Sequence, residues 1–400
     1  MASSSQCDIG IIGGGLVGLC AALALQHTEK QISIIEAATF KRSDNAGLNA
    51  GSIVLSYASI QIFKALNIWP LLKPQAEAVQ HIHISSQGHW GISRLRASDY
   101  DIPAFGYVIE SRHLTTCLLQ QVEASERIEL ITPAAFEYIN TAETVDIGYQ
   151  YQDQSQQLCC QLALIADGAH SQARTSLDIA HKTVDYGQSA VITHVEFDRP
   201  MTNHAYERFT GQGPLAMLPL AGNRYACVWV CNHQSAQSLG QTDEAVFITA
   251  LQDCFGYRMG FIESIGKRFC MPLTRTQALA PGKGRCLLIG NAANSLHPVA
   301  GQGFNLALRD VANLYELLAK KTSFDSLITE FQRSRQIEQQ LVAQLGDSLI
   351  SLFSNQLPLL RHARAAGLAV LDLIPTLKTQ VVMTGMGFSF AGNALLRGHL

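Results

Sequence analysis

The stretch Cys7–Gln26, "CDIGIIGGGLVGLCAALALQ", decides how the chain begins to fold. Its apolar start, Ile9–Ile12, predicts a short buried strand, and the small and apolar residues after the glycines predict a helix. Gly13, Gly15 and Gly18 stand between the two in the spacing G-x-G-x-x-G. A strand, this glycine turn and a helix in immediate succession are typical of a phosphate-binding site.

Each glycine of this turn has a physical role. Gly13 makes the tight turn, Gly15 lets a pyrophosphate approach the backbone, and Gly18 lets the helix pack closely on the strand. The helix N-terminus then offers N–H groups and a partial positive charge to the phosphates. A second strand, "QISIIEAA", ends at Glu36, 18 residues beyond Gly18, where a carboxylate would accept hydrogen bonds from a ribose. The sequence therefore predicts a bound dinucleotide, and this motif leaves FAD and NAD open.

In two later stretches an apolar run that predicts a strand is again followed by a glycine-containing turn. One is "LALIADGAHSQAR", in which the apolar run Leu162–Ile165 predicts a strand and Asp167 and Gly168 follow it. The other is "LLIGNAANSLHPVAGQGFNLALRD", residues 287–310, in which Gly301 and Gly303 precede helical apolar spacing. Glycines at the start of a helix admit a ligand to its unpaired N–H groups. Both turns are therefore candidate ligand sites.

Together these three stretches resemble the three fingerprints of the single-component flavin aromatic hydroxylases. The segments "DYGQSAVI", "AYERFTGQGPLAMLPL" and "DSLISLFSN" are similar to the ubiquinone-biosynthesis hydroxylases, most of all to their 2-polyprenyl-6-methoxyphenol hydroxylase branch. The resemblance runs from residue 8 to about residue 390. It implies FAD as the cofactor, and the chain carries no second G-x-G-x-x-G for a nicotinamide nucleotide.

The resemblance also implies which residues hold FAD. Asn291 stands where the wider family usually has Asp, and an amide can still bond the ribityl hydroxyls. The family's Asp-x-Arg before the "LSYAS" segment is replaced here by Asn49 and Gly51. Helix N–H groups at residues 301–303 would stabilise negative charge on the reduced ring by about 0.3–2 kcal/mol. The expected cofactor residues are Gly13, Gly15, Gly18, Glu36, Arg112, Asp167, Gly168, Asn291, Gly301, Gln302, Gly303 and Asn305.

The reaction that the resemblance implies is hydroxylation of an electron-rich phenol. NAD(P)H would reduce FAD transiently, O₂ would form a flavin C4a-hydroperoxide, and its distal oxygen would enter the ring of a polyprenylated phenol. The candidate catalytic residues are His297, Pro298, Gly301 and Gln302. His297 is the one titratable side chain in the flavin motif, and a structural histidine is favoured over a base for the phenol.

Candidate substrate contacts come from alternating strand positions. Arg208 shares a strand face with Tyr206, and Leu215, Met217 and Pro219 share a face of the next strand. The side chains of the first strand could equally well face solvent. Those of the second strand could equally well pack in the core. His81, His83 and His89 lack a cysteine or acid at ligand spacing, so we expect no metal.

The predicted fold is α/β, namely a Rossmann-like FAD-binding domain with an inserted antiparallel-sheet substrate domain and a helical C-terminal tail, as in p-hydroxybenzoate hydroxylase. Alternating segments in "HIHISSQGHWGISRLR" predict a hairpin that turns at Gln87-Gly88. We expect the FAD-binding domain to comprise 1–78, 100–180 and 273–345, the substrate domain 79–99 and 181–272, and the tail 346–400.

Composition narrows the setting of the protein. Of its 400 residues 47% are hydrophobic and 15% charged, and the net charge of −3 gives no reason to expect nucleic acid. There is no basic leader and no uninterrupted apolar window for a spanning helix, and the ten cysteines form no C-x-x-C pair. We expect a cytoplasmic protein. The basic and apolar tail is explained either by contact with a membrane surface or, as we favour, by packing or oligomerisation.

Two alternatives to the hydroxylase remain open on the sequence. One is an FAD oxidase or dehydrogenase of the same architecture that does not hydroxylate. The other is a non-catalytic flavin-bound scaffold of a lipid-biosynthesis complex. The partners expected for the leading hypothesis are O₂ and the polyprenylated phenol, with other ubiquinone-biosynthesis proteins, a second copy of the chain and a membrane surface left open.

Overall fold

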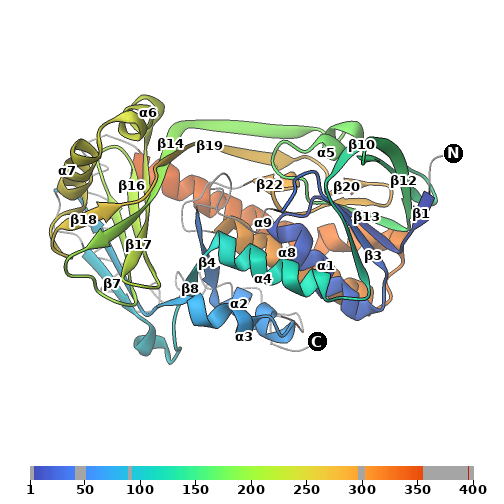
Figure 1. Cartoon of the computed structure of the whole chain (residues 1–400), viewed down its shortest axis with the longest axis horizontal. Helices are drawn as coiled ribbons and strands as arrows, with labels where there is room; N and C mark the ends of the chain where they lie inside the picture. Colours follow the sequence, from blue (N-terminus) through green and yellow to red (C-terminus); the bar gives the residue numbers. More distant parts are fainter. Residues whose placement is uncertain (1–3, 41–50, 89–91, 296–301, 355–394, 396–400) are drawn as a thin grey trace.

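The computed structural model describes residues 4–40, 51–88, 92–295, 302–354 and 395. Figure 1 shows a part built of strands and long helices and, at the opposite end, a large sheet covered by two helices. The long strands β14 (His181–Phe197) and β19 (Phe269–Ala278) run between these two ends. The chain is α/β, as the sequence predicts.

A six-stranded sheet forms the centre of the part that contains the first glycine turn. Five of its strands are parallel, and only β20 pairs antiparallel, with β21. Strands β2 and β3 are buried at every position, which is typical of a parallel sheet whose two faces are both covered by other layers. The order of the strands is β20 (Gly282–Lys283), β21 (Cys286–Leu288), β13 (Leu162–Ile165), β2 (Ile9–Ile12), β3 (Ile32–Ile35) and β9 (Ile128–Ile131).

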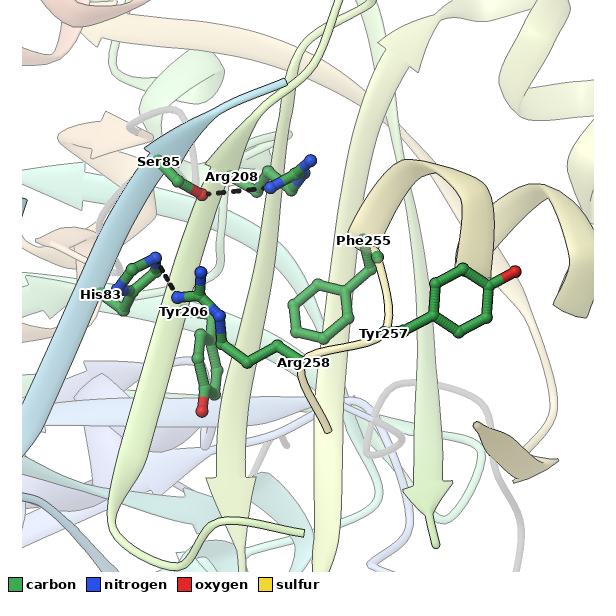
Figure 2. Close-up of a pocket in the computed structure, with 8 residues that line it drawn as sticks. His83, Ser85, Tyr206, Arg208, Phe255, Tyr257 and Arg258 are labelled. Atoms are coloured by element: carbon green, nitrogen blue, oxygen red, sulfur yellow. Dashed lines mark hydrogen bonds between the residues drawn. The ribbon is translucent and has the colours of Figure 1, made fainter. Parts of the chain in front are cut away.

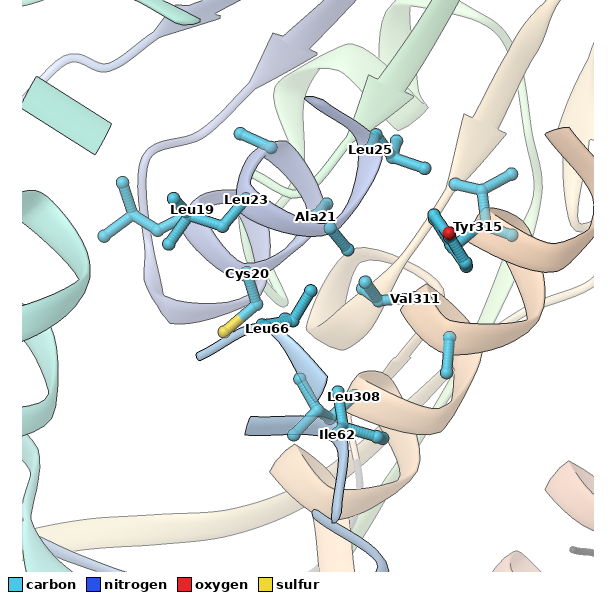
Figure 3. Packing of buried hydrophobic residues seen from close by; sticks show 14 of the residues in the cluster. Leu19, Cys20, Ala21, Leu23, Leu25, Ile62, Leu66, Leu308, Val311 and Tyr315 are labelled. Carbon is cyan, nitrogen blue, oxygen red and sulfur yellow. The ribbon is translucent and has the colours of Figure 1, made fainter. Parts of the chain in front are cut away.

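Helices cover one face of this sheet and a second sheet covers the other. Figure 3 shows the core on the helical side, where side chains of α1, α2 and α8 interdigitate around Leu19, Ile62 and Val311. The helices here are α1 (Leu16–Leu25), α2 (Tyr57–Ala65), α3 (Trp69–Leu72), α4 (Ser111–Glu123) and α8 (Gln302–Ala319). The opposite face packs on β1 (Ser4–Gln6), β10 (Ala134–Thr141), β11 (Val145–Tyr151) and β12 (Gln154–Cys160).

The large sheet carries the strands that the sequence predicts for a substrate domain. Its order is β22 (Asn294–Ser295), β19, β14, β17 (Arg224–Asn232), β16 (Pro214–Leu220), β15 (His204–Phe209), β6 (His81–Ser86) and β7 (Ile92–Arg96), with β18 (Ile262–Ile265) paired to β14. Strands β6 and β7 pair antiparallel, which confirms the predicted hairpin. Strands β6 and β15 pair in parallel, although the sequence led us to expect an antiparallel sheet. No hairpin joins these two, so chain connectivity does not fix their direction.

The two faces of the large sheet have different neighbours. Helices α6 (His233–Gln241) and α7 (Glu244–Phe255) cover the outer face, as Figure 1 shows at the left. The inner face packs on the three-stranded sheet of β4 (Ser52–Ser56), β8 (Gly106–Glu110) and β5 (Glu77–Val79). The ion pair between Glu110 and Arg224, at 2.6 Å, also joins β8 to the large sheet. The domain boundaries given above stay a prediction, because β14 and β19 extend through both parts.

Helix α9 (Phe324–Ser354) follows α8 and is joined to it by buried charges. Arg335 Nε donates to Asp310 Oδ1 at 2.6 Å and its Nη1 donates to Glu338, while Arg309 Nε donates to Glu338 Oε1 at 2.5 Å. None of these four side chains is more than 5% exposed.

The predicted tail falls mostly outside the described residues. Of its last part only Leu395 is described, and it is fully buried in the main core. Across the ranges that the structure describes, every helix is too short or too polar to cross a membrane.

Candidate functional site

The first glycine turn, after β2, needs glycine at two positions. Gly13 has φ of +104°, and a Cβ there would lie 2.6 Å from the carbonyl oxygen of Ala166. A Cβ at Gly18 would lie 2.0 Å from the carbonyl oxygen of Gly13. The close contacts come from the loop after β13 and from the turn itself, so the two glycines allow this turn to pack.

Gly15 differs from them, because it faces open space. It is the N-cap of α1, no side chain of the described residues caps the helix, and a Cβ at Gly15 would meet nothing within 4 Å. The first turn of α1 carries no acidic residue. An uncapped helix N-terminus with room before it fits the phosphates of a dinucleotide.

Glu36 lies at the end of β3 and closes on this turn. Its Oε2 accepts from the backbone N–H of Gly14 at 2.5 Å, and its Oε1 accepts from Ala38 N–H at 2.7 Å. A carboxylate has about four acceptor sites, so two remain for the hydroxyls of a ribose. The geometry fits the role that the sequence predicts for Glu36.

The second turn, after β13, presents an unused acceptor. Asp167 Oδ2 accepts from Ala173 N–H at 3.2 Å, whereas its Oδ1 is buried and has no hydrogen-bond partner among the described residues. A buried carboxylate oxygen without a donor is costly, and a ligand hydroxyl would satisfy it. Gly168, next in the chain, has φ of +89° and open space beside it. Asp167 therefore fits a sugar-like hydroxyl chain.

Contacts between the turns bring them together at the carboxyl ends of β2, β13 and β21. Arg174 is 2% exposed and donates to Ala292 O at 2.8 Å and to Ala169 O at 2.9 Å, so it joins the second turn to the third. Gly290 has φ of +61°, and a Cβ there would lie 3.0 Å from the Val17 side chain of α1. Three turns that are far apart in the sequence therefore form one site.

The third turn leads from Asn291, exposed on a short 3-10 helix (Gly290–Ala292), to the start of α8. Gln302 and Gly303 form the first residues of α8, and a Cβ at Gly303 would meet nothing within 4 Å. The predicted residues His297, Pro298 and Gly301 lie outside the described residues.

Asn305 anchors the start of α8. It is 1% exposed, its Oδ1 accepts from Ser56 N–H at 2.9 Å and from Ser59 Oγ at 2.7 Å, and its Nδ2 donates to Val54 O at 2.8 Å. These bonds fix α8 against β4 and α2, beside the inner face of the large sheet. Asn305 thus holds the start of α8 in place. Its own side chain is buried and so does not form part of an exposed surface for a ligand.

Arg112 occupies the first turn of α4, and its side chain is exposed. The residue before it, Ser111, donates its backbone N–H to Gly51 O at 2.9 Å, so the segment that lacks the family's Asp-x-Arg lies directly beside this helix start.

The four predicted substrate residues do not lie on the inner face. Leu215 and Met217 are fully buried in the core that α7 makes with the outer face, and Pro219 shares their side of β16. Arg208 lines a cavity on that outer face (Figure 2). The structure thus places Leu215 and Met217 in the core, which is the alternative given for their strand, and a substrate role for Arg208 and Pro219 stays a prediction. Strand alternation gave the shared face, but the sequence could not say which layer that face meets.

The inner face carries a residue that sequence reasoning missed. Glu207 stands between Tyr206 and Arg208 on β15, so its side chain points to the opposite side of the sheet. Ala205, on that same side, packs with Val108 of β8. Burial raises the pKa of Glu207 to about 7. The available signal was a single acid inside an apolar strand segment, "AYERFT".

The histidines examined for a metal have other contacts. His81 stacks on His204 with 4.2 Å between ring centroids, and His83 accepts a hydrogen bond from Arg258. His89 is not among the described residues. In the part of the chain that the structure describes, no three His, Cys, Asp or Glu side chains are grouped as metal ligands.

Comparisons with known proteins agree with this site. Residues 6–344 match the sequence profile of the family described as FAD binding domain. Ubiquinone hydroxylase UbiL of Rhodospirillum rubrum is 30% identical over 386 residues, which cover 95% of this chain and 89% of that protein. The 3-demethoxyubiquinol 3-hydroxylase of Escherichia coli is 27% identical over 391 residues, which cover 95% of this chain and 98% of that protein.

The fold also matches solved structures. The p-nitrophenol 4-monooxygenase PnpA of Pseudomonas putida superposes with a TM-score of 0.80 at 13% identity, covering 97% of this chain and 100% of that chain. At this identity the likeness concerns the fold, and it confirms the predicted architecture.

Proposed function

This chain belongs to the family described as FAD binding domain, and from that premise we propose that it is an FAD- and NAD(P)H-dependent monooxygenase that hydroxylates the ring of a polyprenylated phenol in ubiquinone biosynthesis. The names of its relatives support this substrate class, since UbiL and the Escherichia coli protein are both named as hydroxylases of ubiquinone or a ubiquinol.

One observation carries the cofactor part of the proposal. The contacts of Arg174 and Gly290 gather three distant turns, and the gathered site offers an open helix N-terminus at Gly15 and an unpartnered acceptor at Asp167. These are the features that phosphates and ribityl hydroxyls require. FAD bound there supplies the activation of O₂ that a hydroxylation needs.

We assign roles to the chain's own residues accordingly. The N–H groups after Gly15 bind the pyrophosphate, Glu36 binds the ribose, and Asp167 with Asn291 binds the ribityl chain. The N-terminus of α8 at Gln302 and Gly303 lies against the flavin ring and stabilises negative charge on it. Arg112, at a neighbouring helix start, contributes a further positive charge toward the cofactor. His297, Pro298 and Gly301 are proposed neighbours of the ring on the basis of the motif alone.

The inner face of the large sheet suits a greasy phenol. Ile84, Ala216 and Val228 are half-buried there, and they are small or apolar. Such a surface would exclude water from the reacting ring and offer apolar contact to a prenyl chain. We propose this face as the substrate side of the pocket.

A polyprenylated substrate resides in a membrane, so we also propose that the protein works as a peripheral protein at a membrane surface. Association with other ubiquinone-biosynthesis proteins or with a second copy of the chain would shorten the path of the substrate between enzymes. Binding of the purified protein to phospholipid vesicles, and its mass in solution, test these points separately.

The test of the central proposal is the origin of the new oxygen atom. Purified FAD-loaded protein is mixed with NADPH or NADH, ¹⁸O₂ and a short-chain prenylated methoxyphenol, and the product is analysed by mass spectrometry. We expect one ¹⁸O atom in each product molecule and one nicotinamide oxidised for each. The position of the label on the ring identifies the hydroxylated carbon.

Two other outcomes would contradict it. An oxidised product without ¹⁸O would identify an oxidase or dehydrogenase of the same architecture. A yellow protein whose flavin is not reduced by NADH or NADPH, with or without the phenol, would identify a non-catalytic flavin scaffold.

A further inference from the structure

A cavity of about 350 Å³ lies on the outer face of the large sheet, away from the nucleotide turns. Figure 2 shows it between strands β6 and β15 and the segment that follows α7. The side chains that give it its chemistry are His83, Ser85, Tyr206, Arg208, Tyr257 and Arg258.

The cavity is positively charged. Arg208 and Arg258 both line it, and no Asp or Glu is among the described residues of its wall. Burial together with Arg258, Arg94 and Arg208 lowers the pKa of His83 to about 4, so His83 is neutral and accepts a hydrogen bond from Arg258. Burial and Arg258 also lower the pKa of Arg208. Two guanidinium groups that repel one another therefore lie here, and no acidic side chain of the described wall neutralises them.

Arg208 has donors to spare. Its Nε is buried and has no partner in the described part of the chain, and its Nη1 reaches only Ser85 Oγ, at 3.5 Å. A guanidinium whose Nε is buried and has no partner among the described residues, and which faces a cavity, suits an oxyanion that can accept two parallel hydrogen bonds. Phosphate has this geometry and the charge that the cavity lacks.

One residue of the wall, Tyr257, belongs to an exposed pair of aromatic rings. Tyr257 is 60% exposed and Phe261 is 64% exposed, and their rings meet edge-to-face at 5.4 Å. Exposed aromatic rings beside a cationic cavity offer a contact for the organic part of a ligand.

We propose that this cavity binds the phosphate group of an organic ligand, with Arg208 and Arg258 as its charge-assisted donors and Tyr257 at the organic portion. The site lies on the face of the sheet opposite to the proposed flavin and phenol, so it is separate from the reaction. A soluble phosphorylated compound and a phospholipid headgroup share this chemistry.

The test is calorimetric titration of the FAD-loaded protein with inorganic phosphate at constant ionic strength. We expect saturable binding that weakens roughly tenfold or more in both Arg208→Met and Arg258→Met, because each substitution removes charge-assisted hydrogen bonds. Arg333→Met, an exposed arginine on α9, is the matched control and should bind as the parent does. Arg258 is exposed, so its variant keeps the test valid if Arg208→Met does not fold.

A second arm identifies the source of the phosphate. Sedimentation with phosphatidylglycerol vesicles, and with phosphatidylcholine vesicles as the neutral comparison, is run on the same variants. Arginine-dependent binding to phosphatidylglycerol supports a phospholipid headgroup, and arginine-dependent binding of free phosphate without vesicle binding supports a soluble ligand. The proposal is overturned if neither probe binds. It is also overturned if both probes bind Arg208→Met and Arg258→Met as tightly as they bind the parent protein.

A second inference comes from Glu207, on the inner face of the same strand. Its register neighbours are Ile84 on β6 and Ala216 on β16, both apolar. In the described ranges its carboxylate makes no hydrogen bond or ion pair, and burial is the sole cause of its raised pKa. The charged and titratable groups on that side, Glu110 and Arg224 with His194 near them, interact with one another instead.

We infer, resting on the proposed function, that Glu207 accepts the proton of the substrate's phenol hydroxyl. The O–H bond breaks, the proton moves to a carboxylate oxygen of Glu207, and the electron pair stays on the phenolate oxygen. The phenolate donates electron density into the ring, which activates the ring carbon for hydroxylation. A lone carboxylate in an apolar wall suits this role, because no other partner competes for it.

The pH dependence of product formation tests this role. The base is the ionised carboxylate, so product per nicotinamide oxidised should rise with pH through about 7, the pKa that burial gives Glu207. In Glu207→Gln this rise should be absent, with product formation above neutral pH roughly 100-fold lower. Glu263→Gln, an exposed acid on β18, should keep the parent profile.

The outcomes separate this inference from the proposed function. If the parent protein forms no hydroxylated product, the proposed function fails. If the parent protein hydroxylates and Glu207→Gln keeps its rate and its pH profile, only the inference about Glu207 fails.

Thermal unfolding adds a readout that does not need turnover. A buried carboxyl with a raised pKa lowers stability as pH rises from about 4.5 to about 7, so Glu207→Gln should raise Tm at pH 8 and change it little at pH 5. Equal Tm differences at both pH values would show that the pKa of Glu207 is not raised in the folded protein.

Discussion

Gly13 and Gly15 belong to the same turn, but the space beside them differs. A Cβ at Gly13 would press on a backbone carbonyl at 2.6 Å and would force a non-glycine residue to φ of +104°, whereas a Cβ at Gly15 would enter open space. Gly13 is therefore needed for the fold itself, and Gly15 leaves open the space in which we propose that the ligand binds.

This difference predicts distinct variants. Gly13→Ala should lower the free energy of unfolding of the flavin-free protein by about 1–3 kcal/mol. Gly15→Ala should leave that free energy nearly unchanged but weaken FAD binding, because its Cβ occupies the approach of the pyrophosphate. Chemical denaturation and fluorescence titration with FAD measure the two effects. Equal behaviour of the two variants would mean that the turn is not oriented as described.

Asp167 supplies a second prediction at this scale. Its unpartnered Oδ1 should bond the ribityl chain, so Asp167→Ala should raise the Kd for FAD by roughly tenfold or more. Asp178→Asn, at an exposed position after α5 (Gln172–Ser176), is the control. An unchanged Kd in Asp167→Ala would remove this residue from the cofactor site.

Single residues also show where sequence reasoning stops. The glycines and Asp167 could be predicted because a short local pattern fixes their geometry. Glu207 could not, because its role depends on which layers cover the two faces of β15. Alternation places Tyr206 and Arg208 on one side, but only the packing of α7 identifies that side as the outer one.

Among the elements, the α8–α9 pair depends on charges that do not touch the cofactor. Arg309 and Asp310 of α8 meet Arg335 and Glu338 of α9, and all four are buried. Burying charges is costly, and their mutual contacts offset that cost only while each keeps its partner. The network therefore fixes how α9 packs on α8, the helix whose start we propose as a contact of the flavin ring.

Arg335→Met should lower the free energy of unfolding by about 3–5 kcal/mol, because it leaves Asp310 and Glu338 without their shared cation. Arg333→Met, two residues earlier and exposed, should change it by about 0.5 kcal/mol or less. Urea denaturation monitored by circular dichroism gives both values. A small effect at Arg335 would mean that the buried network does not hold the two helices together.

The sequence contains every charge of this network and still does not reveal it. In "FQRSRQIEQQL" the charged residues are typical of a solvated helix face, and only the pairing with α8 buries Arg335 and Glu338 among them. By contrast, strands such as Ile9–Ile12 and Leu162–Ile165 were predicted with their observed bounds, because apolar runs before glycine turns are a local signal.

The whole molecule is organised around two unlike sheets, which are connected through the small sheet of β4, β5 and β8 and the start of α8. The parallel sheet presents its three turns at one edge, and the inner face of the large sheet packs beside the start of α8 through β4 and β8. The fold class and the convergence of the three turns could be predicted from the motifs. The parallel pairing of β6 with β15 and the orientation of the large sheet could not, since both arise from chain segments far apart in sequence.

The most direct test of this arrangement is a crystal structure of the FAD-loaded protein. The account predicts a pyrophosphate at the N–H groups after Gly15, a ribityl hydroxyl at Asp167 Oδ1, and a flavin ring between the N-terminus of α8 and the inner face that carries Glu207. A flavin ring on the outer face, beside Arg208 and Leu215, or a pyrophosphate away from Gly15, would contradict it.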